Sequence, residues 1–338
     1  MISREIHLVK RPKAAPDASH FKLVETEVPD TLEADQVLVK NLWMSVDPYM
    51  RPRMNDVKSY IPPYQVGEVL EGGAIGLVIA SKNDKLPIGT YVESMNGWRE
   101  YFVSGRRGLG IRDTSHVAPQ DYLGIMGMPG ITAYVGTTVL GAAKAGDTVY
   151  VSGAAGAVGS LVCQIAKALG CTVMGSAGSD EKVDWLLNSA HIDGAFNYRN
   201  EANQSAAIAQ VCPKGIDLFF DNVGGSQLDA ALMNMRKNGR VILCGSIEDY
   251  NAPSKDRQGV KNLFRAIAMG LSIKGFIIFD YMADHQKAFV EDMARWRGEG
   301  KIQNQETILN GIERAPEAFL GLFSGANLGK MLVKLADE

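Results

Sequence analysis

One segment near the middle of the chain constrains the fold more than any other. Residues 148–159 read Thr-Val-Tyr-Val-Ser-Gly-Ala-Ala-Gly-Ala-Val-Gly, and residues 160–170 continue as Ser-Leu-Val-Cys-Gln-Ile-Ala-Lys-Ala-Leu-Gly. This pattern is typical of a β-branched strand, a tight turn of small residues and a helix that ends at a glycine. In a parallel sheet such a layout holds the pyrophosphate of a dinucleotide at the helix N-terminus. The segment therefore predicts a site for a nicotinamide or flavin cofactor.

The rest of the chain after about residue 121 predicts a doubly wound parallel sheet of the Rossmann type. Apolar runs of the buried kind alternate there with helical stretches. The expected strands are 148–152, 171–175, 194–198, 216–221, 240–245 and 272–278, and the expected helices are 160–169, 180–189, 226–236 and 284–298. Gly170, Gly239 and Gly300 stand where helices should end, so we expect a left-handed backbone conformation at each.

The first 120 residues predict a second kind of domain. Short β-type runs, such as 36–40, 76–80 and 98–103, are separated by glycine and proline. They are typical of a compact, mostly antiparallel, barrel-like unit. We expect a helix near residues 315–323 and a last strand at 329–335, which returns to this unit. Two domains also agree with the length of 338 residues, which exceeds what one hydrophobic core usually serves.

Charge and composition exclude several classes of partner. A net charge of −3 gives no broad attraction to nucleic acid or to an anionic membrane. The N-terminus lacks the apolar core of a secretory signal, and no apolar run approaches the ~20 residues that cross a bilayer. We therefore expect a cytoplasmic protein. The four cysteines form no Cys-x-x-Cys pair and the five histidines are isolated, so no metal site is expected.

The end of the second predicted strand favours NADP over NAD. An NAD site normally has an acid there for the ribose hydroxyl, whereas residues 175–179 read Gly-Ser-Ala-Gly-Ser. Ser176 and Ser179 can donate hydrogen bonds to a phosphate, and Lys182 supplies positive charge. The acids at 180–181 fit the first turn of a helix. In the alternative interpretation Lys182 is an ordinary solvated lysine.

Missing motifs narrow the reaction. The chain has no ligand cluster for a zinc ion that would polarise an alcohol, and none of its eleven tyrosines has a lysine four residues later. A catalytic Cys–His pair has no local signature either. The chemistry that remains is hydride transfer to a carbon already activated by conjugation to a carbonyl group. Such a reaction needs orientation of the substrate and one donor for the developing enolate.

Several motifs together resemble the zinc-independent branch of the medium-chain dehydrogenase/reductases. The motifs are Asp47-Pro-Tyr-Met-Arg51, Met128-Pro-Gly-Ile-Thr-Ala-Tyr134, Ala154-Ala-Gly-Ala-Val-Gly159, Asp221-Asn-Val-Gly-Gly225 and Asn327-Leu-Gly-Lys330. Within that branch the chain is most similar to the leukotriene B4 dehydrogenase and prostaglandin reductase group, to plant alkenal double-bond reductases and to bacterial curcumin reductase. The matches extend from about residue 10 to residue 335.

This resemblance implies both an architecture and an activity. The architecture is a GroES-like β-barrel catalytic domain, residues 1–121 and 299–338, and a Rossmann NADP-binding domain, residues 122–298. The activity is the NADPH-dependent reduction of the carbon–carbon double bond of α,β-unsaturated aldehydes and ketones. A homodimer joined through the Rossmann sheets is also implied.

The turn motif and the resemblance together predict the cofactor contacts. Lys182 and Tyr198 are expected on the side of the adenosine 2′-phosphate, the segments 244–250 and 276–282 at the nicotinamide, and Asn327 at the closing edge of the site. The full set is Ala154, Ala155, Gly156, Ala157, Val158, Gly159, Ser179, Lys182, Tyr198, Asn222, Cys244, Gly245, Ser246, Tyr250, Phe276, Ile278 and Asn327.

Tyr49 and Tyr60 are the predicted catalytic residues. Tyr49 resembles the substrate-side tyrosine of the family, and Tyr60 resembles a tyrosine of the curcumin-reductase type that acts as proton donor. Ala268 stands where mammalian and plant members have a tyrosine, which leaves Tyr60, Tyr250 or water as the donor. A phenol, with an ordinary pKa of about 10, stays protonated at neutral pH and can donate. In the alternative interpretation Tyr49 and Tyr60 are packing residues with satisfied hydroxyls.

Two other functions remain open from the sequence. An NADPH:quinone oxidoreductase would use the same fold, because quinones are also conjugated carbonyl compounds. A non-catalytic NADPH-binding protein is the second alternative, and Ala268 is the feature that points to it.

Overall fold

The computed structural model describes residues 1–29, 31–253, 256–257 and 259–338, and it divides into two compact units. Unit 1 comprises Met1–Gly124, Glu306–Asn327 and Met331–Glu338. Unit 2 comprises Ile125–Gln305 and Leu328–Lys330. Each unit has a sheet of its own, so the mixed α/β class with a strand-rich domain and a parallel-sheet domain is confirmed.

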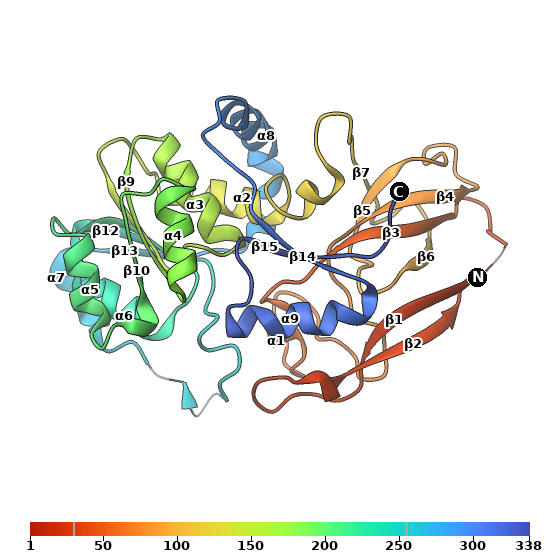
Figure 1. Ribbon diagram of the computed structural model, residues 1–338, viewed down its shortest axis with the longest axis horizontal. Helices are drawn as coiled ribbons and strands as arrows, with labels where there is room; N and C mark the ends of the chain where they lie inside the picture. The colour runs from red at the N-terminus through yellow and green to blue at the C-terminus, as the bar shows by residue number, and fades with distance from the viewer. Residues whose placement is uncertain (30, 254–255, 258) are drawn as a thin grey trace. The chain divides into compact units, whose positions relative to one another are not determined.

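Unit 1 is built from a seven-stranded sheet and a separate hairpin. The sheet order is β14-β15-β3-β4-β5-β7, with β6 paired to β3, and β1 and β2 run side by side as the hairpin (Figure 1). The strands are β1 (Ile2–Leu8), β2 (Phe21–Glu27), β3 (Val37–Ser45), β4 (Ala74–Ser81), β5 (Tyr91–Ser94), β6 (Tyr101–Ser104), β7 (Gly110–Ile111), β14 (Glu306–Asn310) and β15 (Lys330–Lys334). The helices are α1 (Met50–Arg53), α9 (Ala315–Ser324) and the 3₁₀ turns η1 (Ala18–His20), η2 (Pro119–Leu123) and η8 (Ile312–Arg314).

The last strand returns to the N-terminal sheet, as the sequence predicted. Strand β15 pairs antiparallel with β3, and Leu332 lies opposite Ser45. Three aromatic rings then hold α9 and the hairpin to one core. The rings of Phe21, Trp98 and Phe319 lie 6.0–6.2 Å apart between centroids, which is the spacing of favourable aromatic pairs.

Unit 2 is a six-stranded parallel sheet in the order β10-β9-β8-β11-β12-β13. This order is that of the dinucleotide-binding doubly wound fold. In that fold the ligand crevice lies at the carboxyl ends of the two central strands, here β8 and β11, where the strand order reverses. The strands are β8 (Thr148–Val151), β9 (Thr172–Ala177), β10 (Gly194–Asn197), β11 (Ile216–Asp221), β12 (Met235–Leu243) and β13 (Ser272–Gly275). The helices are α2 (Met128–Tyr134), α3 (Ala157–Ala168), α4 (Asp180–Asn188), α5 (Gln204–Val211), α6 (Gly225–Met233), α7 (Arg265–Met269) and α8 (Met282–Gly298), with the π-helix η3 (Val135–Leu140) and the 3₁₀ turns η4 (Tyr198–Asn200), η6 (Lys261–Phe264) and η7 (Ile278–Asp280).

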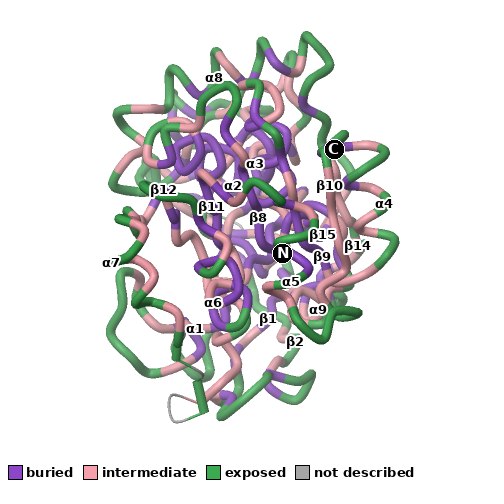
Figure 2. The backbone as a smooth tube through the Cα atoms, turned by 90° about the vertical axis from the view of Figure 1, so that its left-hand side faces the viewer, coloured by how far each residue is buried: buried purple, intermediate pink, exposed green. Residues whose placement is uncertain are grey.

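Burial in unit 2 is greatest at the middle of the sheet. Figure 2 shows buried backbone along β8, β11 and α3, and exposed backbone along much of α4 and α7. Strand β13 forms one edge of the sheet, and all four of its residues are exposed. The central strands β8 and β11 are mostly apolar and buried, as expected for parallel strands covered on both faces.

Two of the three glycines expected to end helices have the left-handed conformation. Gly170 and Gly300 have φ angles of 83° and 70°, which confirms the prediction for them. Gly239 lies inside β12 instead, and Asn238 takes the positive φ of 62°. The helix expected at 226–236 ends at Met233, because Met235 is buried in the core and already pairs with Ile216 of β11.

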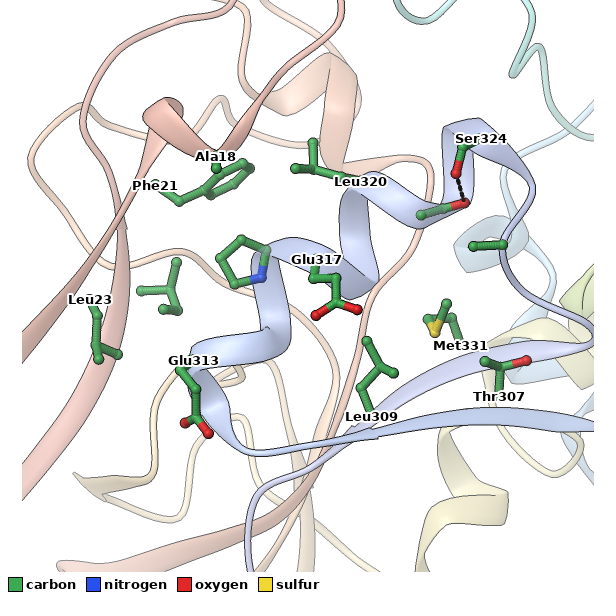
Figure 3. Close-up of a pocket in the computed structure, with 14 residues that line it drawn as sticks. Ala18, Phe21, Leu23, Thr307, Leu309, Glu313, Glu317, Leu320, Ser324 and Met331 are labelled. Atoms are coloured by element: carbon green, nitrogen blue, oxygen red, sulfur yellow. Dashed lines mark hydrogen bonds between the residues drawn. The ribbon is translucent and has the colours of Figure 1, made fainter.

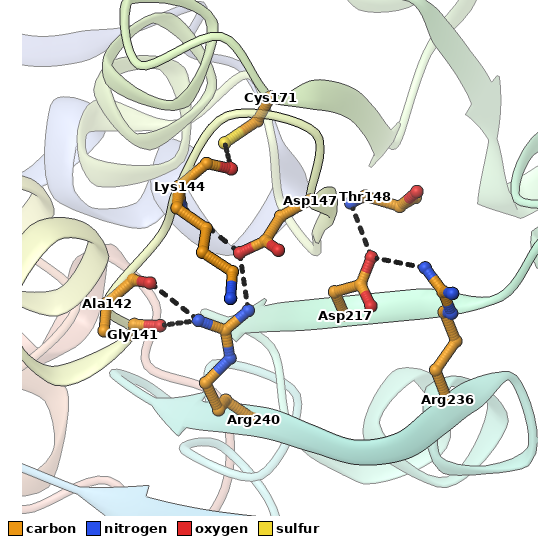
Figure 4. Close-up of polar contacts among 9 residues, drawn as sticks. All are labelled: Gly141, Ala142, Lys144, Asp147, Thr148, Cys171, Asp217, Arg236 and Arg240. Atoms are coloured by element: carbon orange, nitrogen blue, oxygen red, sulfur yellow. Dashed lines mark hydrogen bonds and ion pairs between the residues drawn. The ribbon is translucent and has the colours of Figure 1, made fainter.

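A polar cluster that the sequence did not reveal attaches the start of β8 to the sheet (Figure 4). The guanidinium of Arg240 donates to the carbonyl oxygens of Gly141 and Ala142 at 2.6 and 2.7 Å and to Asp147 Oδ2 at 2.6 Å. On β11, Asp217 accepts from the backbone N–H of Thr148 at 2.9 Å. Arg240 thus satisfies carbonyl groups that follow the π-helix, which would otherwise lack donors.

Candidate functional site

The turn after β8 leads into α3 with free backbone donors at the helix N-terminus. Gly153 has a φ of 57°, and Gly156 is the N-cap with extended backbone and no side-chain cap. The N–H of Gly156 donates to Gly153 O at 3.1 Å, and the N–H of Ser160 is the first to reach back, to Gly156 O at 2.9 Å. The N–H groups of Ala157, Val158 and Gly159 therefore point out of the first turn, where they can bind an anion.

Two glycines let helix and strands approach closely at this turn. A Cβ on Gly159 would lie 2.2 Å from Gly153 O, and a Cβ on Gly175 would lie 2.6 Å from the Cβ of Ala154. Ala154 occupies the place of the usual first glycine and is fully buried, so Gly175 on β9 provides its room. This compensation was not predicted. Ala155 is also buried, and its carbonyl oxygen accepts from the N–H of Gly329 at 2.9 Å.

Three of the predicted residues meet at the carboxyl end of β9. Ser179 caps α4, and its Oγ accepts from the N–H of Lys182 at 3.4 Å. Tyr198 lies against Gly178, where an added Cβ would come within 2.8 Å of the tyrosine hydroxyl. Ser176 does not fit its prediction, because its buried hydroxyl donates to Gln227 Oε1 at 2.7 Å and so is not available to a phosphate.

Two cations, Lys182 and Arg199, lie together at this corner, and sequence reasoning missed Arg199. The pKa of Lys182 is lowered by burial and by the neighbouring charge of Arg199. Two cations held this close favour a doubly charged anion between them. Asp180 accepts from the side-chain amides of Asn197 and Asn200 at 2.7 and 3.2 Å, which fixes the turn that carries Arg199. The signal in the sequence was the basic residue directly after Tyr198.

A buried carboxylate organises the predicted nicotinamide end. Asp221, at the end of β11, is fully buried. Its Oδ1 accepts from Ser152 Oγ at 2.7 Å and from the N–H groups of Val223 and Gly224 at 3.0 Å. The amide of Asn222 donates to Ser152 O at 2.8 Å. The turn that presents Asn222 is therefore tied to the end of β8, and burial raises the pKa of Asp221.

The segment after β12 runs beside that turn. The N–H groups of Cys244 and Gly245 both donate to Asp221 O, at 2.8 and 3.1 Å. Ser246 N–H donates to the hydroxyl of Tyr250 at 3.3 Å. Asn222 and the predicted residues Cys244, Gly245, Ser246 and Tyr250 are thus brought together. Burial raises the pKa of the Cys244 thiol to about 12.

Phe276 and Ile278 follow the end of β13. Ile278 is buried. The ring of Phe276 approaches Gly136 of the π-helix, because a Cβ added there would lie 3.2 Å from Phe276 Cζ. Ala268 is exposed on α7.

In unit 1 the two predicted catalytic tyrosines share one neighbourhood. Tyr49 precedes α1 and is half-buried, whereas Tyr60 is 55% exposed. The pKa of Tyr49 is raised well above its usual value, first by burial and then by Asp47, Tyr64 and Tyr60, while Arg53 opposes the shift. Asn327 is buried where the chain leaves α9.

A cavity of about 850 Å³ also lies in unit 1. It is lined by the hairpin, β14 and α9, with Phe21, Leu309 and Leu320 on its walls (Figure 3). Glu317 is paired with Arg314 at 2.6 Å. None of the residues predicted from the sequence lines this cavity.

Among the described residues, no three or more His, Cys, Asp and Glu side chains are grouped so that they could hold a metal ion. Across the same part of the chain, no helix has the length and apolar character needed to cross a membrane.

The chain is similar to known proteins over nearly its whole length. Residues 4–111 match the family of the N-terminal domain of oxidoreductases, and residues 157–295 match the zinc-binding dehydrogenases. The chain is 42% identical over 317 residues to 2-alkenal reductase (NADP(+)-dependent) of Nicotiana tabacum, which covers 93% of this chain and 91% of that protein. It is 39% identical over 322 residues to prostaglandin reductase 1 of Bos taurus, covering 94% and 95%. The crystal structure of CurA from Vibrio vulnificus in complex with NADPH superposes with a TM-score of 0.94 at 38% identity, covering 99% of this chain and 100% of that one.

The buried carboxylate of Asp221 gives a test of this site by stability. Because burial raises its pKa above the ordinary 3.8, the folded chain keeps the proton over a pH range in which the unfolded chain has released it. The bound proton stabilises the folded chain, so the free energy of unfolding should fall as the pH rises from the ordinary pKa of an aspartate to the raised pKa of Asp221. Urea unfolding of the wild type and of Asp221→Asn at several pH values should show a difference that grows in favour of the variant across that window.

The control is Asp113→Asn, since Ser115 lowers the pKa of the exposed Asp113. For this pair the difference in the free energy of unfolding should grow in favour of the wild type as the pH rises, because the lowered pKa makes the charged Asp113 stabilising. A difference between Asp221→Asn and the wild type that is constant with pH would contradict the assignment.

Proposed function

Because this chain belongs to the zinc-independent medium-chain dehydrogenase/reductases, in the group of the prostaglandin and alkenal reductases, we propose that it reduces the carbon–carbon double bond of α,β-unsaturated aldehydes and ketones with NADPH. The observation that carries the proposal is the α3 N-terminus, whose first-turn N–H groups have no side-chain cap. An anion fits there, and the cationic corner at Lys182 and Arg199 fits a second one. A pyrophosphate and a 2′-phosphate provide this pair.

We propose that the predicted cofactor residues act in three groups. The N–H groups of residues 157–159 bind the pyrophosphate. Lys182, Tyr198 and Arg199 bind the 2′-phosphate, and Ser179 holds the helix that carries Lys182. Asn222, the segment 244–250, Phe276, Ile278 and Asn327 surround the nicotinamide end. When bound, NADPH supplies the hydride that adds to the β-carbon of the substrate.

We propose different roles for the two tyrosines. The raised pKa of Tyr49 keeps its phenol protonated, so it suits a hydrogen bond to the substrate carbonyl oxygen. Tyr60 is more exposed and would deliver the proton to the α-carbon, as a general acid. Ala268 carries no hydroxyl, and of the donors left open, Tyr60, Tyr250 and water, we propose Tyr60.

Three further statements belong to the proposal. Residues 1–121 and 299–338 form the catalytic domain, and residues 122–298 form the NADP-binding domain. The chain works in the cytoplasm, which agrees with four cysteines that form no disulfide. Two copies join through strand β13, which forms an edge of the sheet. Ile273 in this strand is exposed, and so are three apolar residues of the segment before it, Leu263, Phe264 and Ile267.

The proposed reaction predicts that the protein consumes NADPH when 2-alkenals or linear enones are added. The measurement is NADPH absorbance with a panel of enals, enones and simple quinones, with product analysis to show a saturated aldehyde or ketone. Replacing Tyr60 by Phe should lower kcat by at least about tenfold, because a positioned acid is removed. No NADPH consumption with any enal or enone would reject the function.

The 2′-phosphate corner predicts cofactor discrimination. Lys182→Ala should weaken NADPH binding by about 10- to 100-fold, the usual value of a charge-assisted hydrogen bond, and should leave NADH binding nearly unchanged. Fluorescence titration with each dinucleotide measures both constants. Lys167→Ala is the matched control. Lys167 lies in the last turn of α3, at the end of that helix away from the proposed pyrophosphate site, and it pairs with Asp193. An equal loss for both dinucleotides would refute the role of Lys182.

The exposed edge predicts that negative charge on β13 and on the preceding helix α7 separates the two copies. A double variant, Ile267→Glu with Ile273→Glu, should run as a monomer in size exclusion with light scattering, whereas the wild type should run as a dimer. Val290→Glu, at a similarly exposed apolar position on α8, should remain a dimer. A monomeric wild type would rule the interface out.

A further inference from the structure

Arg53 is a buried cation that neither the sequence motifs nor the proposed mechanism uses. It is the last residue of α1 and is 5% exposed. Its Nε donates to Pro62 O at 2.9 Å, and its Nη2 donates to Glu71 Oε2 at 2.7 Å. The Cζ atom of its guanidinium lies over the ring of Tyr64, 4.0 Å from the centroid. One side chain therefore makes three different kinds of contact.

These contacts close the base of the segment 54–63. The backbone of Arg53 accepts from the N–H of Tyr64 at 2.8 Å, so the two ends of the segment meet at this residue. Tyr64 is itself buried, and its hydroxyl donates to Glu71 O at 2.6 Å. On the other side, Arg11 donates to Met54 O at 3.0 Å. Hydrogen bonds thus hold both ends of the segment.

The segment carries Tyr60 only two residues before the carbonyl that Arg53 holds. Two residues span at most about 7 Å of extended chain. Pro62 and Pro63 further restrict the backbone, because a residue before proline is confined to extended conformations. The position of Pro62 therefore limits where the backbone of Tyr60, and with it the phenol, can lie.

We propose that Arg53 is the positioning residue for Tyr60: by clamping Pro62 and Tyr64 it places the Tyr60 hydroxyl where the substrate is protonated. This inference rests on the proposed role of Tyr60. Lysine cannot replace the clamp, because an ammonium group lacks the planar fork that bonds a carbonyl and a carboxylate while it stacks on a ring.

A double-mutant cycle tests the proposal. In the wild-type background Arg53→Lys should lower kcat for a small enone by at least about tenfold, since small displacements of a catalytic group are costly. In the Tyr60→Phe background the same change should lower kcat by less than about twofold, because the group that it positions is already gone. Equal effects in the two backgrounds would overturn the inference.

The matched control is Arg112→Lys. Arg112 also pairs with a glutamate, Glu93, and lies 5.4 Å from the ring centroid of Tyr122. It belongs to the same unit, so its loss reports the general cost of removing such a clamp. That variant should keep its kcat in both backgrounds.

A second measurement does not depend on turnover. Hydrogen–deuterium exchange should rise in residues 55–63 of Arg53→Lys and stay unchanged in the sheet of unit 1. If Arg53→Lys does not fold, Glu71→Gln removes one partner of the clamp and should give the same exchange pattern. Unchanged exchange in 55–63 would also overturn the inference. A wild type inactive on all enones would instead reject the proposed function, and an active Tyr60→Phe would reject the role of Tyr60.

Discussion

Helix α3 begins so close to the turn after strand β8 that no side chain fits at Gly159. A Cβ on Gly159 would overlap the carbonyl oxygen of Gly153, so the first turn of the helix is held directly over the carboxyl edge of the sheet. The Asp221 carboxylate then joins the ends of β8 and β11 through Ser152, and the segment after β12 attaches to the same aspartate through its backbone. One close approach and one buried acid thus align the loops at which an α/β sheet binds its ligand.

Much of this architecture could be read from the sequence, because it depends on short-range patterns. Apolar runs between glycines predicted the six parallel strands, and the turn at 153–159 predicted the helix N-terminus. The return of β15 to the N-terminal sheet was also predicted and is confirmed. Where local patterns competed, the prediction was wrong: Met235 is buried beside β11, so the strand begins inside the expected helix, and Asn238 rather than Gly239 takes the left-handed conformation.

The parts that could not be read depend on partners far away in the sequence. Ser176 has the right position for a phosphate contact, but Gln227, which lies on a later helix, takes its hydroxyl. Ala154 fits the turn only because Gly175 lies opposite. Arg240 reaches carbonyl groups about a hundred positions earlier in the chain, and no periodicity marks such a contact. The clamp of Arg53 is local in sequence, yet no sequence pattern indicates that one guanidinium contacts a carbonyl, a carboxylate and a ring.

The burial of the four thiols has a consequence for an enzyme of this chemistry. Cys163, Cys171 and Cys212 are buried and Cys244 is half-buried. Burial raises the pKa of Cys171 to about 11 and those of Cys212 and Cys244 to about 12, and it raises that of Cys163 as well. Conjugated aldehydes and ketones are electrophiles that alkylate thiolates. At a pH far below its pKa, a thiol is almost entirely protonated. The chain therefore presents almost no thiolate to its own electrophilic substrates. We expect it to resist alkylation by the compounds that it reduces.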